Sequence, residues 1–367
     1  MASTAKHDWP MVPLLEIAED VTRGHKKVPK SAYEEVGSTP IVDQSMDFIC
    51  GYSDEVPTLV LPPYIVFGDH TRELKYIDFA FVPGADGVKV LKPAEGIEPK
   101  FLYYYLQAHP VQDLGYSRHF KLLKELGIPL PPLNEQRRIA AILDGAKGQI
   151  DKFEGAETLL STMTSSWLAR RSQSIPRMKL SELGTFRGGM TPSKKKSEYW
   201  GGDVFWFTTK DLKFAEVYES EDRITDRALD ETSASLIREP SIAFSLRGMS
   251  LAHRLPMSCI PGEVTVNQDL KAFVPNQSKD RDVLFYLVKL REKELLSKVS
   301  SSAHGTKKLD FRHLKELEVP DPCGEFGSEV RRVLEQIRGM QEQIRRRQEA
   351  STTLFQVLST RAFQGEL

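Results

Sequence analysis

A long internal repeat is the feature of this chain that most restricts its fold. The segment Phe120-Lys-Leu-Leu-Lys-Glu-Leu-Gly-Ile-Pro129 returns as Phe311-Arg-His-Leu-Lys-Glu-Leu-Glu-Val-Pro320. Downstream of the prolines, Arg137-Arg138-Ile139 returns as Arg331-Arg332-Val333. The repeat unit is as long as a domain plus a helix, far longer than the short periods of solenoid proteins. We therefore predict the order globular segment, helix, globular segment, helix.

The composition is that of an ordinary globular protein. Of 367 residues, 40% are hydrophobic and 28% are charged, which allows two or three cores. Cys50, Cys259 and Cys323 are odd in number and form no C-x-x-C pair, so neither a disulfide framework nor a zinc site is expected. The sequence shows no signal-peptide pattern, and no window reaches the ~18 apolar residues of a membrane span. We expect a cytoplasmic protein that is neither exported nor embedded.

A long helix is predicted after each copy of the motif. Pro131 and Pro132 end the preceding segment, and Asn134 is the expected N-cap. Apolar residues then recur at alternating four- and three-residue steps, the spacing of a coiled-coil seam. The expected seam consists of Ile139, Leu143, Ala146, Ile150, Phe153 and Leu160 in the first helix and Val333, Ile337, Met340, Ile344, Arg347, Leu354 and Leu358 in the second.

The two helices are predicted to pair with each other. Each would contain about 35 residues and extend roughly 50 Å, which is too long for one small globular core. An antiparallel pair, with the globular segments at opposite ends, is the economical arrangement. The alternative is two unrelated surface helices.

Both globular segments are predicted to be α+β. Short β-rich runs bounded by Pro and Gly precede one apparent helix in each segment. The expected strands are 58–61, 64–67 and 79–82 in the first segment and 204–207, 241–244 and 264–266 in the second, with helices at 101–106 and 283–287. The predicted boundaries are 1–132 for the first domain, 133–171 for the first long helix, 172–325 for the second domain and 326–367 for the second long helix.

Basic residues near strand ends are the candidate nucleic-acid contacts. The net charge of −1 argues against general coating of nucleic acid, so local patches must supply the charge. Arg72 ends the turn Gly68-Asp-His-Thr-Arg72, and arginine is the favoured bidentate partner of guanine. For any single patch, a solvated surface or an ordinary turn is the plainer interpretation. The candidates are His70, Thr71, Arg72, Lys75, Lys89, Arg118, His119 and Lys121 in the first segment, and Thr191, Lys194, Lys195, Lys196, Thr208, Lys210, Arg247, Gln268, His304, Lys307 and Lys308 in the second.

Catalytic motifs occur only as fragments. Leu61-Pro-Pro-Tyr64 resembles a methyltransferase loop, but leucine cannot accept a hydrogen bond from a target amine. Asp69, Glu73 and Lys75 imitate a nuclease set, yet the carboxylates are too close in sequence to come from two strands. The sequence contains no Walker loop, H-E-x-x-H or G-x-S-x-G motif. We expect no catalytic residue and no metal site in this chain.

Several segments together resemble the specificity (S) subunit of type I restriction-modification systems. They are Ile128-Pro-Leu-Pro-Pro-Leu-Asn-Glu-Gln-Arg-Arg-Ile139, the closing 354–367, and Gly189-Met-Thr-Pro-Ser193 with Tyr199-Trp-Gly-Gly202. The resemblance covers nearly the whole chain. It implies two α/β target-recognition domains, each reading one half of a split DNA site, separated by two antiparallel helices that dock two methyltransferase (M) subunits. In the second copy, Asp321-Pro-Cys-Gly-Glu-Phe326 stands where Pro-x-x-Glu-Gln is expected, which predicts an altered docking contact.

The resemblance also implies that the chemistry belongs to partners. This chain would bind double-stranded DNA, two M subunits and, through them, restriction (R) subunits, with no cofactor of its own. S-adenosylmethionine would bind in the M subunits, and ATP and Mg in the R subunits. The alternatives are a self-contained restriction-methylation polypeptide, the S subunit of a related type IIB-like system, and a coiled-coil DNA-binding adaptor without sequence preference.

Overall fold

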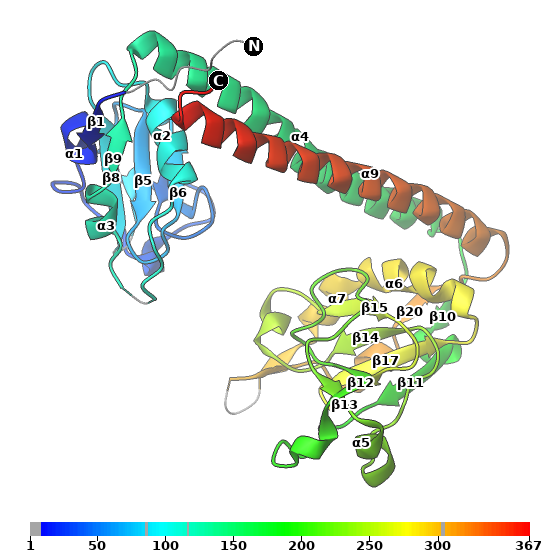
Figure 1. The fold of residues 1–367 in the computed structure, drawn as a ribbon. Helices are drawn as coiled ribbons and strands as arrows, with labels where there is room; N and C mark the ends of the chain where they lie inside the picture. The colour runs from blue at the N-terminus through cyan, green and yellow to red at the C-terminus, as the bar shows by residue number, and fades with distance from the viewer. Residues whose placement is uncertain (1–8, 85–86, 116, 302–304) are drawn as a thin grey trace, which may run out of the picture. The chain divides into compact units, whose positions relative to one another are not determined.

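The chain forms two compact units, each built from one globular segment and part of each long helix (Figure 1). The computed structural model describes residues 9–84, 87–115, 117–301 and 305–367. Unit 1 comprises residues 1–155 and 344–367, and unit 2 comprises residues 156–343. Unit 1 therefore combines the first globular segment with the last part of α9, residues far apart in the sequence.

The described residues of unit 1 form three small β-sheets. Its elements are β1 (Met11–Pro13), α1 (Leu14–Ile17), β2 (Ala18–Asp20), η1 (Lys30–Ala32), β3 (Thr39–Val42), β4 (Gly51–Ser53), β5 (Tyr64–Gly68), β6 (Leu74–Ile77), β7 (Val82–Pro83), β8 (Val88–Pro93), α2 (Pro99–Ala108), α3 (Phe120–Lys124) and β9 (Gly127–Pro129). The largest sheet has the antiparallel order β2-β8-β5-β6. A second sheet has the order β4-β3-β7, with β3 and β7 parallel, and β1 pairs with β9.

Unit 2 repeats this topology. Its elements are β10 (Arg177–Lys179), η2 (Leu180–Glu182), β11 (Gly184–Gly188), η3 (Ser197–Tyr199), β12 (Trp200–Phe207), β13 (Arg223–Ile224), α5 (Asp226–Glu231), β14 (Ser241–Ser245), η4 (Met249–Ala252), β15 (Met257–Ile260), β16 (Thr265–Val266), β17 (Leu270–Pro275), η5 (Ser278–Asp280), α6 (Arg281–Lys289), α7 (Glu292–Ser297), β18 (Ser300–Ser301), β19 (Lys307–Lys308), α8 (Phe311–Lys315) and β20 (Glu318–Pro320). The sheet orders are β11-β17-β14-β15, β13-β12-β16, β10-β20 and β18-β19. The pair β12 and β16 is parallel, as is its counterpart in unit 1. The predicted internal repeat and the α+β class are confirmed, and among the described residues the β18-β19 pair is an addition in unit 2.

The central strand of each large sheet is buried along its whole length. All five residues of β5 and all five of β14 are buried. In unit 1, one face of β5 packs against α2 through residues such as Phe67 and Phe101, while the other packs on Phe81. The predicted strand at 58–61 is wrong, because only Leu59 pairs, through one bridge to Phe81. Its neighbour Leu61 is 70% exposed.

Both long helices are present, as α4 (Leu133–Arg171) and α9 (Gly324–Phe363). Asn134 is not the N-cap. The carbonyl oxygen of Pro132 accepts hydrogen bonds from the amides of Glu135 and Gln136, so the helix begins one residue before the predicted cap. Neither these helices nor any other helix in the described ranges is apolar enough over a sufficient length to cross a membrane.

Near its start, each long helix contacts the residue that precedes α2 in unit 1 or α6 in unit 2. In unit 1, the Gln136 side chain accepts a hydrogen bond from the Glu98 amide, immediately before α2, at 2.9 Å. In unit 2, Arg331 of α9 pairs with Asp280, immediately before α6, at 2.6 Å. Arg331 corresponds in the repeat to Arg137, which lies 3.9 Å from Glu98, so both units have an ion pair at this place. In the first copy, the hydrogen bond of Gln136 is added to that ion pair.

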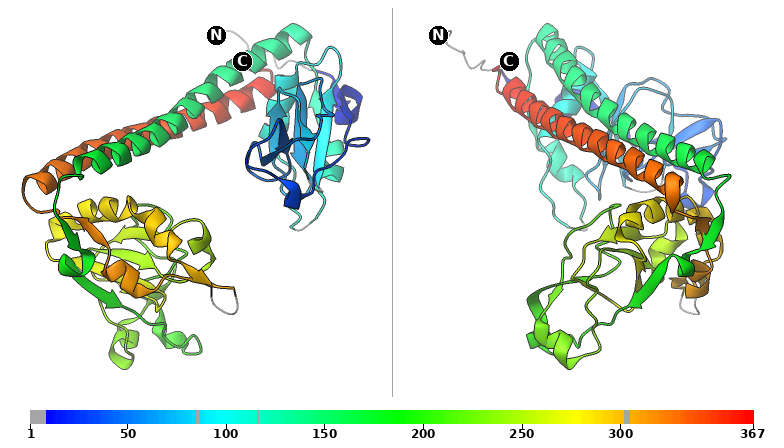
Figure 2. Two further views of the ribbon diagram at one scale, coloured as in Figure 1. Left: turned by 180° about the vertical axis from the view of Figure 1, so that it is seen from behind. Right: turned by 90° about the vertical axis from the view of Figure 1, so that its right-hand side faces the viewer.

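The helix segments are antiparallel within each unit and run side by side in both views of Figure 2. In unit 1, Arg138 donates to the carbonyl oxygen of Leu367 at 2.9 Å, and Gln348 donates to Glu154 at 3.5 Å. In unit 2, Arg171 near the end of α4 pairs with Glu329 near the start of α9 at 2.8 Å. As residue numbers increase along α4, the residues that it contacts on α9 have decreasing numbers, as expected for an antiparallel pair.

The predicted seam is correct on α4 and one residue out of phase over part of α9. Ile139, Leu143 and Ile150 are buried, and Leu160 is partly buried. On α9, Ile337 is buried and Val333, Ile344 and Leu358 are partly buried, whereas Met340, Arg347 and Leu354 are exposed. The inward positions there are Gln341, Gln348, Ser351 and Phe355. Polar residues in this stripe concealed the register, and Phe355 takes the inner position because its ring packs 5.8 Å from that of Tyr104.

Two leucines of unit 1 test this register with the same substitution. Leu143 is fully buried and Leu354 is 54% exposed. Leu143→Ala removes packed methyl groups and should lower the free energy of unfolding by about 2–5 kcal/mol. Leu354→Ala should change it by less than about 0.5 kcal/mol. Urea unfolding measures both, and equal losses would contradict the observed seam.

Candidate nucleic-acid interface

The turn 69–72, which follows β5, is held in place by the buried carboxylate of Asp69. Asp69 is 4% exposed, and its side chain accepts a hydrogen bond from the Phe120 amide at 2.8 Å. Gly68 is required, because a Cβ there would lie 2.1 Å from the Thr71 hydroxyl. Arg72 closes the turn with a positive φ of 63°. The turn is therefore a built element of the domain edge rather than a loose loop.

Arg72 is engaged inside the domain. Its guanidinium pairs with Asp113 at 2.6 Å and donates to the carbonyl oxygen of Val111 at 3.3 Å. The side chain is 32% exposed. These contacts fix the turn to the segment before α3. A base contact by Arg72 stays a prediction, and it would use the donors that Asp113 and Val111 leave free.

Two of the predicted contacts are buried and are corrected here. Lys75 is 4% exposed, and its ammonium donates to the carbonyl oxygens of Asp43 and Asp47. His119 is fully buried, and its ring lies 3.0 Å from the carbonyl oxygen of Asp69. Alternation along β6 turns Lys75 inward, and the contact with the 69–72 turn covers His119. Neither side chain reaches the surface, so both are structural.

The remaining candidates of unit 1 lie around the same turn. His70 is partly buried, with its ring 3.2 Å from the carbonyl oxygen of Ser117. Thr71 donates to the carbonyl oxygen of Gln44 at 2.6 Å. Arg118 and Lys121 are exposed, and Lys89 is partly exposed on β8. The structure thus brings together most of the predicted set of unit 1.

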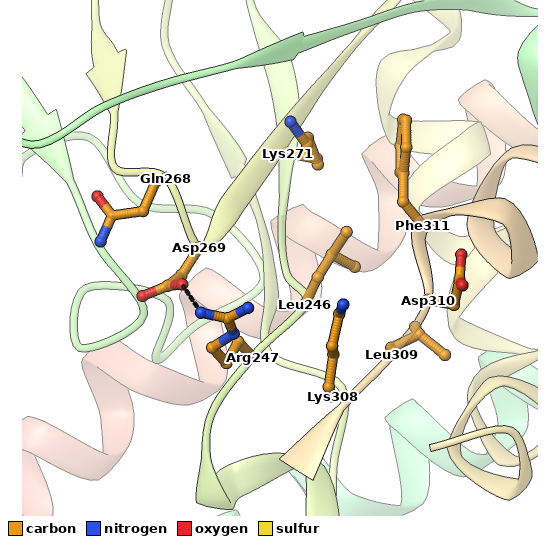
Figure 3. A pocket seen from close by; sticks show the side chains of 9 residues that line it. All are labelled: Leu246, Arg247, Gln268, Asp269, Lys271, Lys308, Leu309, Asp310 and Phe311. Atoms are coloured by element: carbon orange, nitrogen blue, oxygen red, sulfur yellow. Dashed lines mark ion pairs between the residues drawn. The ribbon is translucent and has the colours of Figure 1, made fainter. Parts of the chain in front are cut away.

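Unit 2 gathers predicted residues around one hollow (Figure 3). The hollow has a volume of about 430 Å³ and lies where β14 ends, where β17 begins and where β19 leads into α8. Its lining consists of Leu246, Arg247, Gln268, Asp269, Lys271, Lys308, Leu309, Asp310 and Phe311. Thr191 adjoins it, because its hydroxyl donates to Gln268 at 2.5 Å. Four predicted residues from four separate segments therefore meet at one edge of the sheet.

The hollow carries donors of two kinds. Arg247 is 56% exposed and lies 3.9 Å from Asp269, a loose contact that leaves its planar donors available. Such a fork pairs with two acceptors of one base. Lys308 and Lys271 contribute point charges instead. Lys271 is not among the residues predicted from the sequence, although it occupies the same strand position as the predicted Lys89.

Other predicted residues of unit 2 lie outside this lining. The Thr208 hydroxyl donates to Asp211 at 2.9 Å, and Lys210 pairs with Asp222 at 2.9 Å. Lys194, Lys195 and Lys196 are exposed. Lys307 donates to Ser301 at 2.9 Å, and His304 lies outside the described residues. Contact of these residues with DNA stays a prediction.

The fragments of catalytic motifs do not assemble. Asp69 is bound to the Phe120 amide, and Lys75 points instead to the carbonyl oxygens of residues 43 and 47. The Tyr64 hydroxyl accepts a hydrogen bond from the Leu61 amide at 3.2 Å, which makes that segment a closed turn. Within the described ranges, three His, Cys, Asp or Glu side chains nowhere gather as a metal site would require.

The segment 43–50, which supports the 69–72 turn, depends on the buried Asp43. Burial raises the pKa of its carboxyl, but hydrogen bonds from Cys50, Ser45 and Tyr33 outweigh burial and lower the pKa from 3.8 to about 2. The Cys50 thiol donates to the carboxylate at 2.8 Å. The ionised form of Asp43 is therefore part of the folded structure.

The chain matches the family described as Type I restriction modification DNA specificity domain, over residues 6–154 and again over 176–346. It is 26% identical over 338 residues to the Type I restriction enzyme EcoR124I/EcoR124II specificity subunit of Escherichia coli, covering 86% of this chain and 82% of the relative. It is 30% identical over 162 residues to the MjaIX specificity subunit of Methanocaldococcus jannaschii, covering 42% and 36% respectively.

Two solved structures share the fold. The S subunit of a type I restriction-modification system from M. genitalium aligns with a TM-score of 0.50 at 14% identity, covering 99% of this chain and 98% of that one. A chain from work on complex assembly and conformational transition of the type I R-M system aligns with a TM-score of 0.52 at 17% identity, covering 98% of each.

The Asp43 carboxylate should make stability depend on pH. Because its folded pKa is lowered, its contribution is fully present above the ordinary value of 3.8 and is lost as pH falls toward about 2. Asp43→Asn should cost about 1.5–3 kcal/mol at pH 6 and clearly less at pH 3. Urea unfolding of both proteins at both pH values checks this, with the exposed Glu95→Gln as control. A pH-independent difference would contradict the assignment.

Proposed function

This chain belongs to the type I restriction-modification DNA specificity family, and from that premise we propose that it selects the DNA site for a methyltransferase and, through it, a restriction endonuclease. It is a specificity subunit with two target-recognition domains. In the proposal, residues 1–132 read one half of a bipartite site and residues 172–325 read the other. Residues 133–171 and 326–367 supply the helices that set the unread gap and dock the partners.

One observation carries this proposal: the same scaffold presents different side chains at equivalent places. Phe67 lies opposite Lys89 in unit 1, and Phe244 lies opposite Lys271 in unit 2, so these pairs correspond. His70 follows Phe67 by three residues in unit 1, and Arg247 follows Phe244 by three residues in unit 2, so His70 and Arg247 occupy equivalent places. Imidazole and guanidinium groups select different base edges. Two half-sites of different sequence follow, about one helical turn (~34 Å) apart.

The surfaces of the long helices support the docking part of the proposal. Leu159 and Met163 of α4, in unit 2, are 59% and 60% exposed. Leu354 and Val357 of α9, in unit 1, are 54% and 48% exposed. Apolar side chains at one-turn spacing on an exposed helix face are typical of a partner-binding surface. We assign these faces to the M subunits, which in turn would carry the R subunits.

The chemical steps belong to the partners in this proposal. The residues of this chain bind and orient the duplex. S-adenosylmethionine would be held by the M subunits, with the target adenine turned out of the stack to reach it. ATP and Mg would be held by the R subunits. The isolated chain should therefore neither bind S-adenosylmethionine nor cleave DNA.

Replacement of one domain tests whether each domain reads its own half of the DNA site. Residues 177–320 are exchanged for the matching domain of a relative, and the complex with M subunits is expressed in a host lacking its own methylation. Sequencing of modified bases should show one half-site changed and the other retained, because each unit has its own sheets and core. A change in both halves would contradict independent reading, and methylation without sequence preference would favour a mere adaptor.

Arg247 is the residue on which we expect one base preference to depend. Arg247→Ala removes the planar donors beside the hollow and should cost about 1–3 kcal/mol on the recognised site while relaxing preference at one base pair. Binding of the assembled complex to a set of single-base variants of the site measures both effects. An equal loss on all duplexes would place Arg247 among the phosphate contacts instead.

A further inference from the structure

Unit 1 places two lysines over one phenylalanine ring. The ammonium of Lys89, on β8, lies 5.1 Å from the ring centroid of Phe120, the first residue of α3. The ammonium of Lys124, the last residue of α3, lies 5.6 Å from the same centroid. The ring is 6% exposed, so it is a fixed platform for both charges.

Unit 2 contains the same arrangement. The ammonium of Lys271, on β17, lies 5.5 Å from the ring centroid of Phe311, the first residue of α8. Lys315, the last residue of α8, lies 5.8 Å from that centroid. We refer to each set of two lysines and one ring as a lysine–phenylalanine cluster.

The two clusters occupy equivalent places in the repeat. Lys89 and Lys271 are both the second residue of their strands, and β8 and β17 have the same order of buried and partly buried positions. Each faces a phenylalanine in the central strand, Phe67 or Phe244. The match therefore includes the strand, the helix and all three side chains.

The lysines of the clusters carry charge that the domain itself does not neutralise. In the part of the chain that the structure describes, none of the four forms an ion pair, whereas Lys100 and Lys210 each pair with a carboxylate. An ammonium group without a carboxylate partner retains its full positive charge, which a bound anion would neutralise. Attraction to the ring holds each amine in place, so less entropy is lost when an anion binds.

The cluster of unit 2 lies beside the candidate base contacts. Lys271 and Phe311 line the hollow together with Arg247 and Lys308 (Figure 3). A duplex whose base edge reaches Arg247 would bring its own backbone close to Lys271. The neighbours of the clusters differ between the units, but the clusters do not. A contact that is independent of sequence is expected to be repeated, and a contact that reads sequence is expected to differ.

We propose that each lysine–phenylalanine cluster binds a backbone phosphate of double-stranded DNA, one cluster in each half-site. The inference rests on the proposed function, because it assumes that each unit contacts its own half-site. An ammonium group is a point charge without a planar fork, so it suits a phosphate oxygen better than a base edge. The clusters thus set the position of the duplex, and the residues around them read it.

Single substitutions in the assembled methyltransferase complex test the proposal. Lys89→Gln and Lys271→Gln should each weaken binding by the same factor on the recognised duplex and on one with a scrambled half-site. Each should also reduce the slope of log K against log salt by about one unit. Lys89→Arg and Lys271→Arg should keep the wild-type slope. Lys152→Gln on α4 and Lys293→Gln on α7, both exposed lysines outside the clusters, serve as matched controls.

Ethylation interference then locates the contacts. Lys89→Gln should abolish interference at phosphates of one half-site, and Lys271→Gln at phosphates of the other. If both variants keep the slope of the controls while the wild-type complex still distinguishes the two duplexes, the phosphate assignment is wrong and the proposed function stands. If the wild-type complex does not distinguish the duplexes, the proposed function itself fails. Thermal unfolding of each variant separates loss of contact from loss of fold.

Discussion

The core of unit 1 is completed by the far end of the chain. Phe363, at the end of α9, is 9% exposed, and its ring centroid lies 5.1 Å from that of Tyr105 and 5.7 Å from that of Phe101 on α2. The same cluster includes Ile139 and Leu143 of α4. Burial of one phenylalanine contributes roughly 1.5–3 kcal/mol. This contact joins the end of α9 to α2, and it helps to hold α9 in unit 1.

Each unit uses residues of both long helices in its core. The core of unit 1 includes Phe363 of α9, and the core of unit 2 includes Leu168 of α4 together with Val330 and Leu334 of α9. Neither globular segment buries all of its apolar surface alone. Loop closure over long separations costs little more than over short ones, because the entropy grows only with the logarithm of length. Each long helix can therefore contribute residues to the cores of both units, although these residues are far apart in the sequence.

Duplication of the scaffold left the loops free to diverge. The strand orders, the parallel pairs β3·β7 and β12·β16, and the lysine–phenylalanine clusters are repeated. In contrast, the residues three positions after Phe67 and Phe244 differ between the units: they are His70 and Arg247. Hydrogen bonds of the sheets and packing of the central strands maintain the scaffold, while a side chain at a strand end affects neither. Selectivity can change at such positions at little cost in stability.

The sequence alone determined the order of domains and helices, the α+β class, the helix seam of α4 and the family. Those properties depend on periodicity, prolines and long motifs, which are written along the chain. The tertiary structure decided which basic residues are available. Lys75 and His119 read as surface charges in sequence, yet the fold buries both against carbonyl oxygens of distant segments. Lys271 is not among the residues predicted from the sequence, but pairing with β14 places it at the hollow beside Arg247. Leu354 fits a heptad, although the ring of Phe355, on Tyr104, sets the true register. The physical reason is common to all four: exposure and partnership are set by contacts between segments remote in sequence, and no local pattern records them.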